Sequence, residues 1–368
     1  MKTRLTLLVA LSLLLAHGLP AEAARRRPVA RPLPQVALPV AMADALAAEA
    51  IASGTPGLSI AIGHGQTRFA KGYGRTGGAN TPAVTADTIF QIASLTKQFT
   101  AAAILALEED GLLDVTDSVS EWIPELDLGA RTVTLHHLLT HTSGLRTETE
   151  FLLDPYTPVS QADMIRLIAT RGFATEPGAA EAYNNAGYWL LGVVIERASG
   201  MSYASFLEQR FFIPLAMTRT AYCGTGPAVP VPTGSFEILG RASATPPVHM
   251  SIAAAAGALC SSPADLVTWS RALASGEVIS EASYQKMITR ARLNNGTLLY
   301  YGYGLGLGTT DGIFVTSHNG MIPGFGAYLI HVPSKQITVA VLANALSVTH
   351  NWARDIAREL LDAMLAEE

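Results

Sequence analysis

Ser94 and Lys97 lie three residues apart in segment 91–99 (QIASLTKQF), and this spacing could build a nucleophilic site. Residues i and i+3 of a helix share a face, so the hydroxyl and the amine could touch. Lys97 is the only charged residue between Asp87 and Glu108, and an unpaired ammonium is disfavoured in apolar surroundings. Burial favours the neutral amine, which can accept the proton of a serine hydroxyl. The pair therefore predicts a serine nucleophile with lysine as its base.

A second serine–lysine pair has the same spacing, so the spacing alone is weak evidence. Ser283 and Lys286 lie in SEASYQKMITRAR, where recurring charges are typical of a solvated helix face. We interpret that pair as structural. For Ser94 the ordinary alternative is a helix N-cap, which serine forms readily. A cap does not account for the lone lysine at Lys97, so we favour the catalytic interpretation there.

Two asparagines follow Tyr183 and give the only Tyr-x-Asn motif of the chain, Tyr183-Asn184-Asn185. A phenol has a reference pKa of about 10 and could share the proton transfer if the lysine ammonium stabilised its phenolate. The ordinary alternatives are that Asn185 caps the apolar helix that follows and that Tyr183 packs half-buried. The motif is therefore a candidate second part of the site.

The third candidate motif is His318-Asn319-Gly320, followed by Met321, on an expected strand. A backbone N–H on an edge strand could stabilise an oxyanion, and a glycine lets a substrate come close. A lone histidine in a strand is more often an ordinary half-buried residue. As a site residue, His318 would offer an imidazole that is mostly neutral at pH 7 and gains charge near pH 6.

Apolar patterns predict the elements that must bring these motifs together. The expected helices cover residues 41–51, 94 to about 111, 134–140, 161–169, 187–198, 203–211, 263–274 and 350–368, and the expected strands lie within 56–75, 312–320, 326–332 and 336–345. Strands at both ends with helices between them predict an α+β fold. Its antiparallel sheet would be built from both chain ends and flanked by helices, with a mostly helical central subdomain.

The first 40 residues have the composition of export and linker segments. Residues 1–23 combine a basic start, an apolar run and a small-x-small end, which predicts a signal peptide. The apolar run is shorter than the roughly 20 residues that cross a bilayer, so no membrane span is expected in the mature chain. Residues 24–40 are rich in proline and arginine and predict a flexible tether, which leaves 41–368 as one domain. We therefore expect an exported, periplasmic or secreted protein.

The net charge of the chain limits its possible partners, and its two cysteines raise the question of a disulfide. Without the signal peptide the chain carries 23 basic and 29 acidic residues, a net charge of −6, which argues against a nucleic-acid partner. Cys223 and Cys260 are the only cysteines, and export would carry them into an oxidising compartment. We hypothesise a disulfide between them; two buried free thiols are nearly as compatible with the sequence.

Other chemistries fit the sequence less well. His137 and His141 lie one helical turn apart, but the sequence offers neither the glutamate of a His-Glu-x-x-His motif nor an obvious third zinc ligand. We assign both histidines to structure and expect neither a metal nor a cofactor. A Gly-x-Ser-x-Gly elbow, a P-loop and a dinucleotide fingerprint are missing, which disfavours α/β-hydrolases, NTPases and Rossmann enzymes.

The three motifs in this order resemble the signature of the serine β-lactamase and penicillin-binding protein superfamily. The similarity is to the branch with class C β-lactamases, D-alanyl-D-alanine carboxypeptidases and related esterases. Segment 136–145 (HHLLTHTSGL) also resembles a recurrent segment of that branch, and the resemblance covers about residues 41–365. It implies that Ser94 is the acylated nucleophile, Lys97 its proton acceptor, and Tyr183 the base that helps transfer protons and activate the deacylating water.

The resemblance also implies how substrate would be held. Asn185 would bind a substrate amide, and the N–H groups of Ser94 and Met321 would form the oxyanion hole. His318 and Gly320 would stand where β-lactamases carry the lysine and glycine of Lys-Thr-Gly. Because the lysine is missing, the fixed cation for the carboxylate of a β-lactam is missing too.

The implied function is an exported serine hydrolase that acts through an acyl-enzyme on a small ester, an amide or a D-amino-acid peptide. The alternatives are a non-catalytic module of the same fold that binds peptidoglycan or a partner protein, and a true class C-type β-lactamase. The sequence leaves the substrate, the division of the base role between Lys97 and Tyr183, and the oligomeric state open.

Overall fold

The computed structural model describes residues 37–367 except 225–230, 239–240 and 348, and these residues belong to one compact unit. The predicted signal peptide (1–23) and most of the predicted tether (24–40) lie outside the described residues. The first described helix, α1, spans Val40–Ala52. Within the described part, no helix has the length and apolar character needed to span a membrane.

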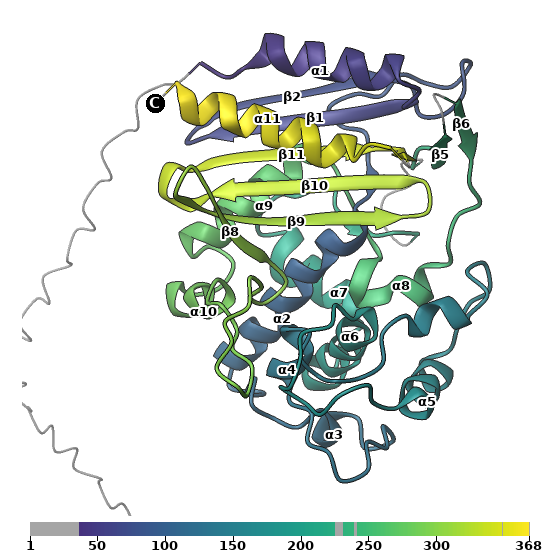
Figure 1. Ribbon diagram of the computed structural model, residues 1–368, viewed down its shortest axis with the longest axis vertical. Helices are drawn as coiled ribbons and strands as arrows, with labels where there is room; N and C mark the ends of the chain where they lie inside the picture. Colours follow the sequence, from purple (N-terminus) through teal and green to yellow (C-terminus); the bar gives the residue numbers. More distant parts are fainter. Residues whose placement is uncertain (1–36, 225–230, 239–240, 348, 368) are drawn as a thin grey trace, which may run out of the picture. The chain divides into compact units, whose positions relative to one another are not determined.

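A six-stranded antiparallel sheet joins segments from the two ends of the sequence (Figure 1). Its strand order is β2-β1-β11-β10-β9-β8. The strands are β1 (Gly57–His64), β2 (Thr67–Gly74), β8 (Gly306–Thr310), β9 (Ile313–Ile322), β10 (Phe325–Val332) and β11 (Ile337–Ala343). The register places Ile60 of β1 opposite Val341 of β11. The predicted α+β fold, with a sheet built from both chain ends, is confirmed.

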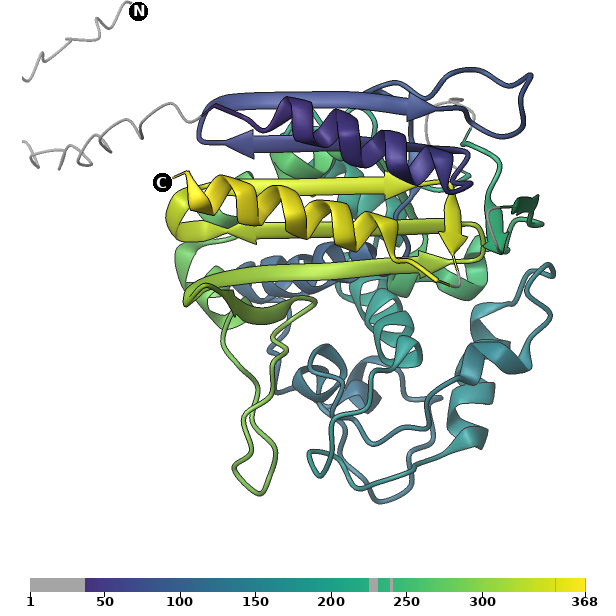
Figure 2. The ribbon, with the colours of Figure 1, turned by 45° about the horizontal axis from the view of Figure 1, so that its top comes forward.

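Helices cover both faces of this sheet because its central strands are apolar on both sides. In β11, Val339 and Val341 pack toward α1 and α11 (Trp352–Ala366), whereas Ala340 and Leu342 pack into the core of the helical part. Figure 2 shows α1 and α11 side by side over one face. Helix α9 (Pro263–Ser275) contacts β1 and β11.

The predicted helical subdomain lies between the two groups of strands in the sequence. Its helices are α2 (Thr96–Glu109), α3 (Val119–Trp122), α4 (Leu135–Leu139), α5 (Gln161–Arg171), α6 (Asn185–Ser199), α7 (Tyr203–Leu207), α8 (Met250–Gly257) and α10 (Glu281–Met287). Every residue of α2 from Thr96 to Leu107 is buried, which accounts for the absence of charged residues other than Lys97 in this stretch. The helix expected over 203–211 ends earlier, and a π-helical turn at Glu208–Phe212 follows it. This turn buries the adjacent Phe211 and Phe212 together.

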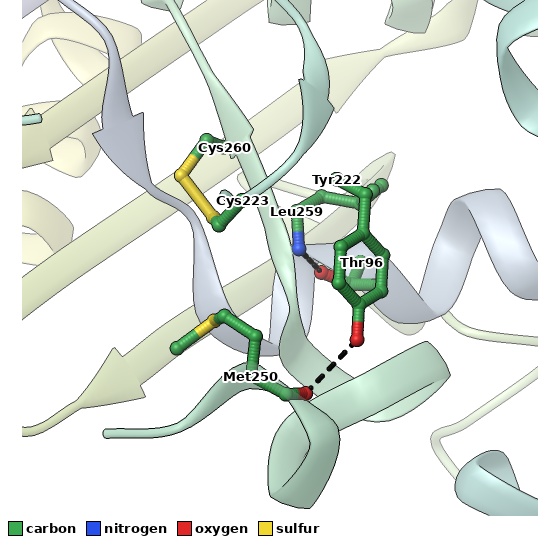
Figure 3. Close-up of a disulfide and its surroundings, with 6 residues drawn as sticks. All are labelled: Thr96, Tyr222, Cys223, Met250, Leu259 and Cys260. Atoms are coloured by element: carbon green, nitrogen blue, oxygen red, sulfur yellow. Dashed lines mark hydrogen bonds between the residues drawn. A yellow bond between two sulfur atoms is a disulfide. The ribbon is translucent and has the colours of Figure 1, made fainter. Parts of the chain in front are cut away.

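Two three-stranded sheets complete the described fold. One has the order β12 (Ala345–Ser347), β5 (Ser235–Ile238) and β6 (Arg241–Ala244), and the other β3 (Phe90–Gln91), β7 (Leu259–Ser261) and β4 (Ala221–Tyr222). The sheet that contains β7 fixes the chain just before Ser94, because β7 pairs with β3. In addition, the N–H of Leu259 donates to Oγ1 of Thr96, 3.1 Å away (Figure 3).

A disulfide joins Cys223 to Cys260 beside this small sheet (Figure 3). Cys260 lies in β7 opposite Gln91, and the N–H of Cys223 donates to the carbonyl of Ala258. The sequence separation of the two cysteines is 37, so the bridge contributes about 3 to 4 kcal/mol in the chain-entropy model. Of the two alternatives that the sequence left open, the structure contains the bridge.

Candidate active site

Ser94 lies in a tight turn that leads into α2. Strand β3 ends at Gln91, and the 3-10 turn η1 (Ala93–Leu95) follows. Ala93 has a φ of 46°, in the left-handed region that residues with a side chain rarely adopt. Leu95 occupies the N-cap position of α2 and no side chain caps the helix there, so Ser94 is not an N-cap. The turn instead leaves the Ser94 side chain half-buried at the start of α2.

Lys97 is fully buried in the first turn of α2 and has three polar neighbours. Its Nζ lies 3.0 Å from Oγ of Ser94, 2.7 Å from Oδ1 of Asn185 and 2.8 Å from the carbonyl oxygen of Ala256. Burial lowers the pKa of Lys97 to about 7, although the charge of Glu150 acts in the opposite direction. A neutral amine has two N–H groups, and these can donate to Oδ1 of Asn185 and to the carbonyl oxygen of Ala256. The lone pair of the nitrogen then faces the Ser94 hydroxyl.

Tyr183 packs over the amine of Lys97, with Nζ 4.8 Å from the ring centroid. The residue is 45% exposed, yet burial of the phenol raises its pKa, and the interaction with the Ser94 side chain only partly offsets this effect. The phenol is therefore protonated at neutral pH. Of these two candidate bases, Lys97 is the one whose pKa lies near neutrality.

Asn185 connects Lys97 to a carboxylate that the sequence did not point to. Asn184 is the N-cap of α6 and accepts from the N–H of Ala186, so Asn185 is not the capping residue. Oδ1 of Asn185 accepts from Lys97, and Nδ2 donates to Oε1 of Glu150 at 2.6 Å. Both ends of the amide already bind protein groups, which fixes its orientation beside Lys97.

His318 is buried, and both of its ring nitrogens bind protein atoms. Nδ1 lies 2.6 Å from the carbonyl oxygen of Asn319, and Nε2 lies 2.9 Å from the Tyr301 hydroxyl. The hydrogen therefore sits on Nδ1, and Nε2 accepts from Tyr301. Burial, and next the charge of Lys97, lower the pKa of His318 to about 4. The expectation that the imidazole gains charge near pH 6 is therefore wrong, because the charged form is desolvated.

Gly320 has a packing role that the sequence did not reveal. A Cβ at this position would lie 2.2 Å from the carbonyl oxygen of Ile92, two residues before Ser94. On the side of Gly320 where a Cβ would project, the backbone of Ile92 thus fills the space. The glycine lets β9 pack directly against η1, which brings Met321 and the Ser94 turn together. The Met321 side chain is 57% exposed.

We expect Gly320→Ala to lower kcat of the hydrolase reaction proposed below by about 10²-fold. The added methyl group must push β9 and the Ser94 turn apart. Small misplacements of reacting groups have effects of this size. Gly308→Ala is the matched control, since a Cβ there would meet only a side-chain atom of Val315 at 4.0 Å. Steady-state kinetics of both variants provide the measurement. Equal activities of the two variants would contradict this role for Gly320.

Tyr301 and Glu150 belong to the site, but sequence reasoning missed both. Glu150 lies in the 3-10 turn η2 (Thr149–Leu152), 35 residues before its partner Asn185, and Tyr301 lies 17 residues before His318. Both residues lie far along the chain from the motif residues they contact, so no local signal could have identified them.

The second serine–lysine pair does not form a site. Lys286 binds Oε2 of Glu108 at 2.7 Å, whereas the N–H of Ser283 donates to Oγ of Ser280. Ser283 is buried, so it does not lie on a solvated face as the charge pattern suggested. The structural interpretation of the pair holds, with Ser283 in the interior.

His137 and His141, which have the spacing of zinc ligands, also bind protein groups. Nδ1 of His137 accepts from the N–H of Thr134, and Nδ1 of His141 accepts from the N–H of Asn184. Across the described residues, no cluster of three or more histidine, cysteine, aspartate or glutamate side chains could hold a metal ion.

Comparison with known proteins relates this geometry to a family. The family model described as Beta-lactamase matches residues 42–363. "Penicillin-binding protein 4*" of Bacillus subtilis (strain 168) is 31% identical over 277 residues, which are 70% of this chain and 61% of that protein. The chain therefore spans less than two thirds of the length of this relative.

Two solved structures share the fold over most of the chain. The octameric penicillin-binding protein homologue from Pyrococcus abyssi has a TM-score of 0.78 and 29% identity, covering 89% of this chain and 78% of its own. A D-stereospecific amidohydrolase from Streptomyces sp. has a TM-score of 0.73 and 27% identity, covering 89% of this chain and 99% of its own. As the three motifs predicted, this chain belongs to the beta-lactamase family.

Proposed function

We propose that the chain is a serine hydrolase that forms an acyl-enzyme at Ser94. The observation that carries this proposal is the buried amine of Lys97, which lies 3.0 Å from Oγ of Ser94 and has a pKa lowered by burial to about 7. A serine hydroxyl needs an adjacent base to become a nucleophile, and a neutral amine at hydrogen-bond distance is such a base.

In acylation, Lys97 takes the hydroxyl proton while Oγ of Ser94 attacks the substrate carbonyl. Asn185 and Ala256 hold two hydrogens of the neutral amine, so its lone pair already points at the hydroxyl. The ammonium that forms gains an interaction with the negative charge of Glu150, which favours the proton transfer. These groups need no rearrangement when the charge develops.

Tyr183 acts as a proton relay in this scheme. Its phenol is protonated at neutral pH and interacts with the side chain of Ser94, so it can donate a proton to the leaving group and regain one from the Lys97 ammonium. The net result moves the serine proton to the leaving group. In deacylation a water molecule attacks the ester carbonyl and gives its proton to the same groups. The bond between the acyl carbon and Oγ of Ser94 then breaks, Oγ regains a proton, and the carboxylic acid is released.

The oxyanion would bind to the backbone N–H groups of Ser94 and Met321. The close packing of β9 on η1 at Gly320 supports this assignment, because it brings the two chain segments together without an intervening side chain. Two fixed N–H donors aimed at the developing charge are the usual means of stabilising a tetrahedral intermediate.

We propose small esters and amides, including those of D-amino acids, as substrates. The name of the Streptomyces sp. relative, a D-stereospecific amidohydrolase, supports the amide class. His318 stays neutral above a pKa of about 4, so the third motif offers no cation to the carboxylate of a β-lactam. Residues 1–23 support action after export, in the periplasm or outside the cell.

A substrate panel tests this proposal at pH 7.5. We expect kcat/KM for a short-chain nitrophenyl ester or a D-amino-acid amide to exceed that for a chromogenic cephalosporin by about tenfold to a hundredfold, since one charge-assisted hydrogen bond of about 1 to 3 kcal/mol is missing. The Ser94→Ala variant corrects for spontaneous hydrolysis. Faster turnover of the cephalosporin would contradict the substrate class, and no turnover of any compound would favour the binding-module alternative.

A further inference from the structure

Tyr183 lies in a segment that cannot position it alone. Residues 174–184 form neither helix nor strand, so contacts with the rest of the fold must hold them. The residues on either side of Tyr183 both bind His141. The N–H of Ala182 donates to the carbonyl oxygen of His141 at 2.9 Å, and the N–H of Asn184 donates to its Nδ1 at 3.1 Å.

His141 also contacts Tyr183 through its ring. The imidazole centroid lies 4.3 Å from that of Tyr183, 4.8 Å from that of Tyr301 and 5.1 Å from that of Tyr188. The residue is 2% exposed, so the contact excludes water. The same imidazole therefore contacts the ring of Tyr183 and also accepts a hydrogen bond from the next residue, Asn184.

Side-chain packing alone does not explain two features of His141, its backbone conformation and its buried Nε2. Its φ is 59°, in the left-handed region, which lets its carbonyl and its ring face the same segment. Its Nε2 is buried with no hydrogen-bond partner among the described residues. Because Nδ1 accepts from Asn184, the neutral ring must carry its hydrogen on Nε2. Both features cost stability, which is typical of residues that serve a site.

We propose that His141 is a positioning residue for the catalytic reaction, which holds the two peptide groups beside Tyr183 and thereby sets the place of the phenol at Ser94. It acts through Tyr183 and does not touch the substrate. The inference rests on the proton-relay role proposed for Tyr183. It gives a task to segment 136–145 (HHLLTHTSGL), which the catalytic motifs leave unexplained.

Substitutions at His141 in two backgrounds test the proposal. We expect His141→Ala to lower kcat/KM for an ester by about 10- to 100-fold through displacement of the phenol. His141→Asn should recover activity to within about fivefold of the unmodified protein, because asparagine tolerates the left-handed backbone and its Oδ1 can accept from Asn184. In a Tyr183→Phe background, His141→Ala should lower kcat/KM by less than about threefold further, since residues that act as a unit are not additive.

His137→Asn is the matched control, because this histidine lies one turn earlier and its Nδ1 also accepts a backbone hydrogen bond, from Thr134. Its kcat/KM should stay within about twofold of the unmodified protein, and thermal melts should show that all variants fold. The proposal would be overturned if the double variant lost kcat/KM by the product of the His141→Ala and Tyr183→Phe effects. It would also be overturned if His141→Asn were no more active than His141→Ala. If Tyr183→Phe itself keeps full activity, the relay role of Tyr183 has failed, and the proposal fails with it.

Discussion

Replacing Lys97 with arginine should lower kcat/KM for an ester by about 10³-fold, the size of effect expected for a general base. Arginine keeps the positive charge but stays protonated at every accessible pH, so it cannot accept the Ser94 proton. Lys97→Ala should lose as much activity, although it removes the charge as well. Comparable losses in both variants would show that the neutral amine matters, and an arginine variant near full activity would contradict the base role.

The pH dependence of the unmodified protein tests the same role without a substitution. The pKa of Lys97 is lowered to about 7, so the neutral, active amine predominates above that pH and is lost as the pH falls. We therefore expect kcat/KM for an uncharged ester to rise about tenfold per pH unit below 7 and to level off above it. His318, with a pKa of about 4, adds no transition near pH 6. A rate that falls as the pH rises through 7 would contradict Lys97 as the base.

Ser94→Ala should abolish turnover, with a fall in kcat of at least about 10³-fold, because no other hydroxyl among the described residues bonds the amine of Lys97. The change removes one oxygen atom from a half-buried residue that does not cap a helix, so the fold should be retained. Ser283→Ala, in the pair with the same spacing, is the control and should keep activity within about twofold. Comparable losses in the two variants would sink the assignment of Ser94.

The main elements could be predicted because their patterns are local. The apolar run of α2, the hairpin of β1 and β2, and the three strands β9, β10 and β11 each show their pattern in a few consecutive residues. The termination of the helix that starts at Tyr203 was not predicted, since the π-helical turn depends on where Phe211 and Phe212 fit in the core. Packing of this kind has no signature within the segment itself.

Some parts of the candidate site could also be predicted from the sequence, and others could not. Residue type and spacing pointed to Ser94, Lys97, Tyr183 and Asn185, and the structure brings these four together. The environment of His318 could not be predicted, because the burial that lowers its pKa comes from segments far away in the sequence.

Contacts between segments far apart in the sequence also could not be predicted. Gly320 meets the backbone of Ile92, more than 200 residues earlier, and only the folded chain shows this contact. The bond between Glu150 and Asn185 joins a short loop helix to α6, and the left-handed turn at His141 has no composition cue. These parts of the site therefore had to come from the structure.

The central claim is the acyl-enzyme at Ser94, and the mass of the intact protein tests it most directly. After incubation with a serine-reactive phosphonate probe, we expect one adduct mass per chain, and peptide mapping should place it on Ser94. The Ser94→Ala variant should gain no mass, whereas Ser283→Ala should be labelled as fully as the unmodified protein. An adduct on another residue, or labelling that persists in Ser94→Ala, would contradict the account.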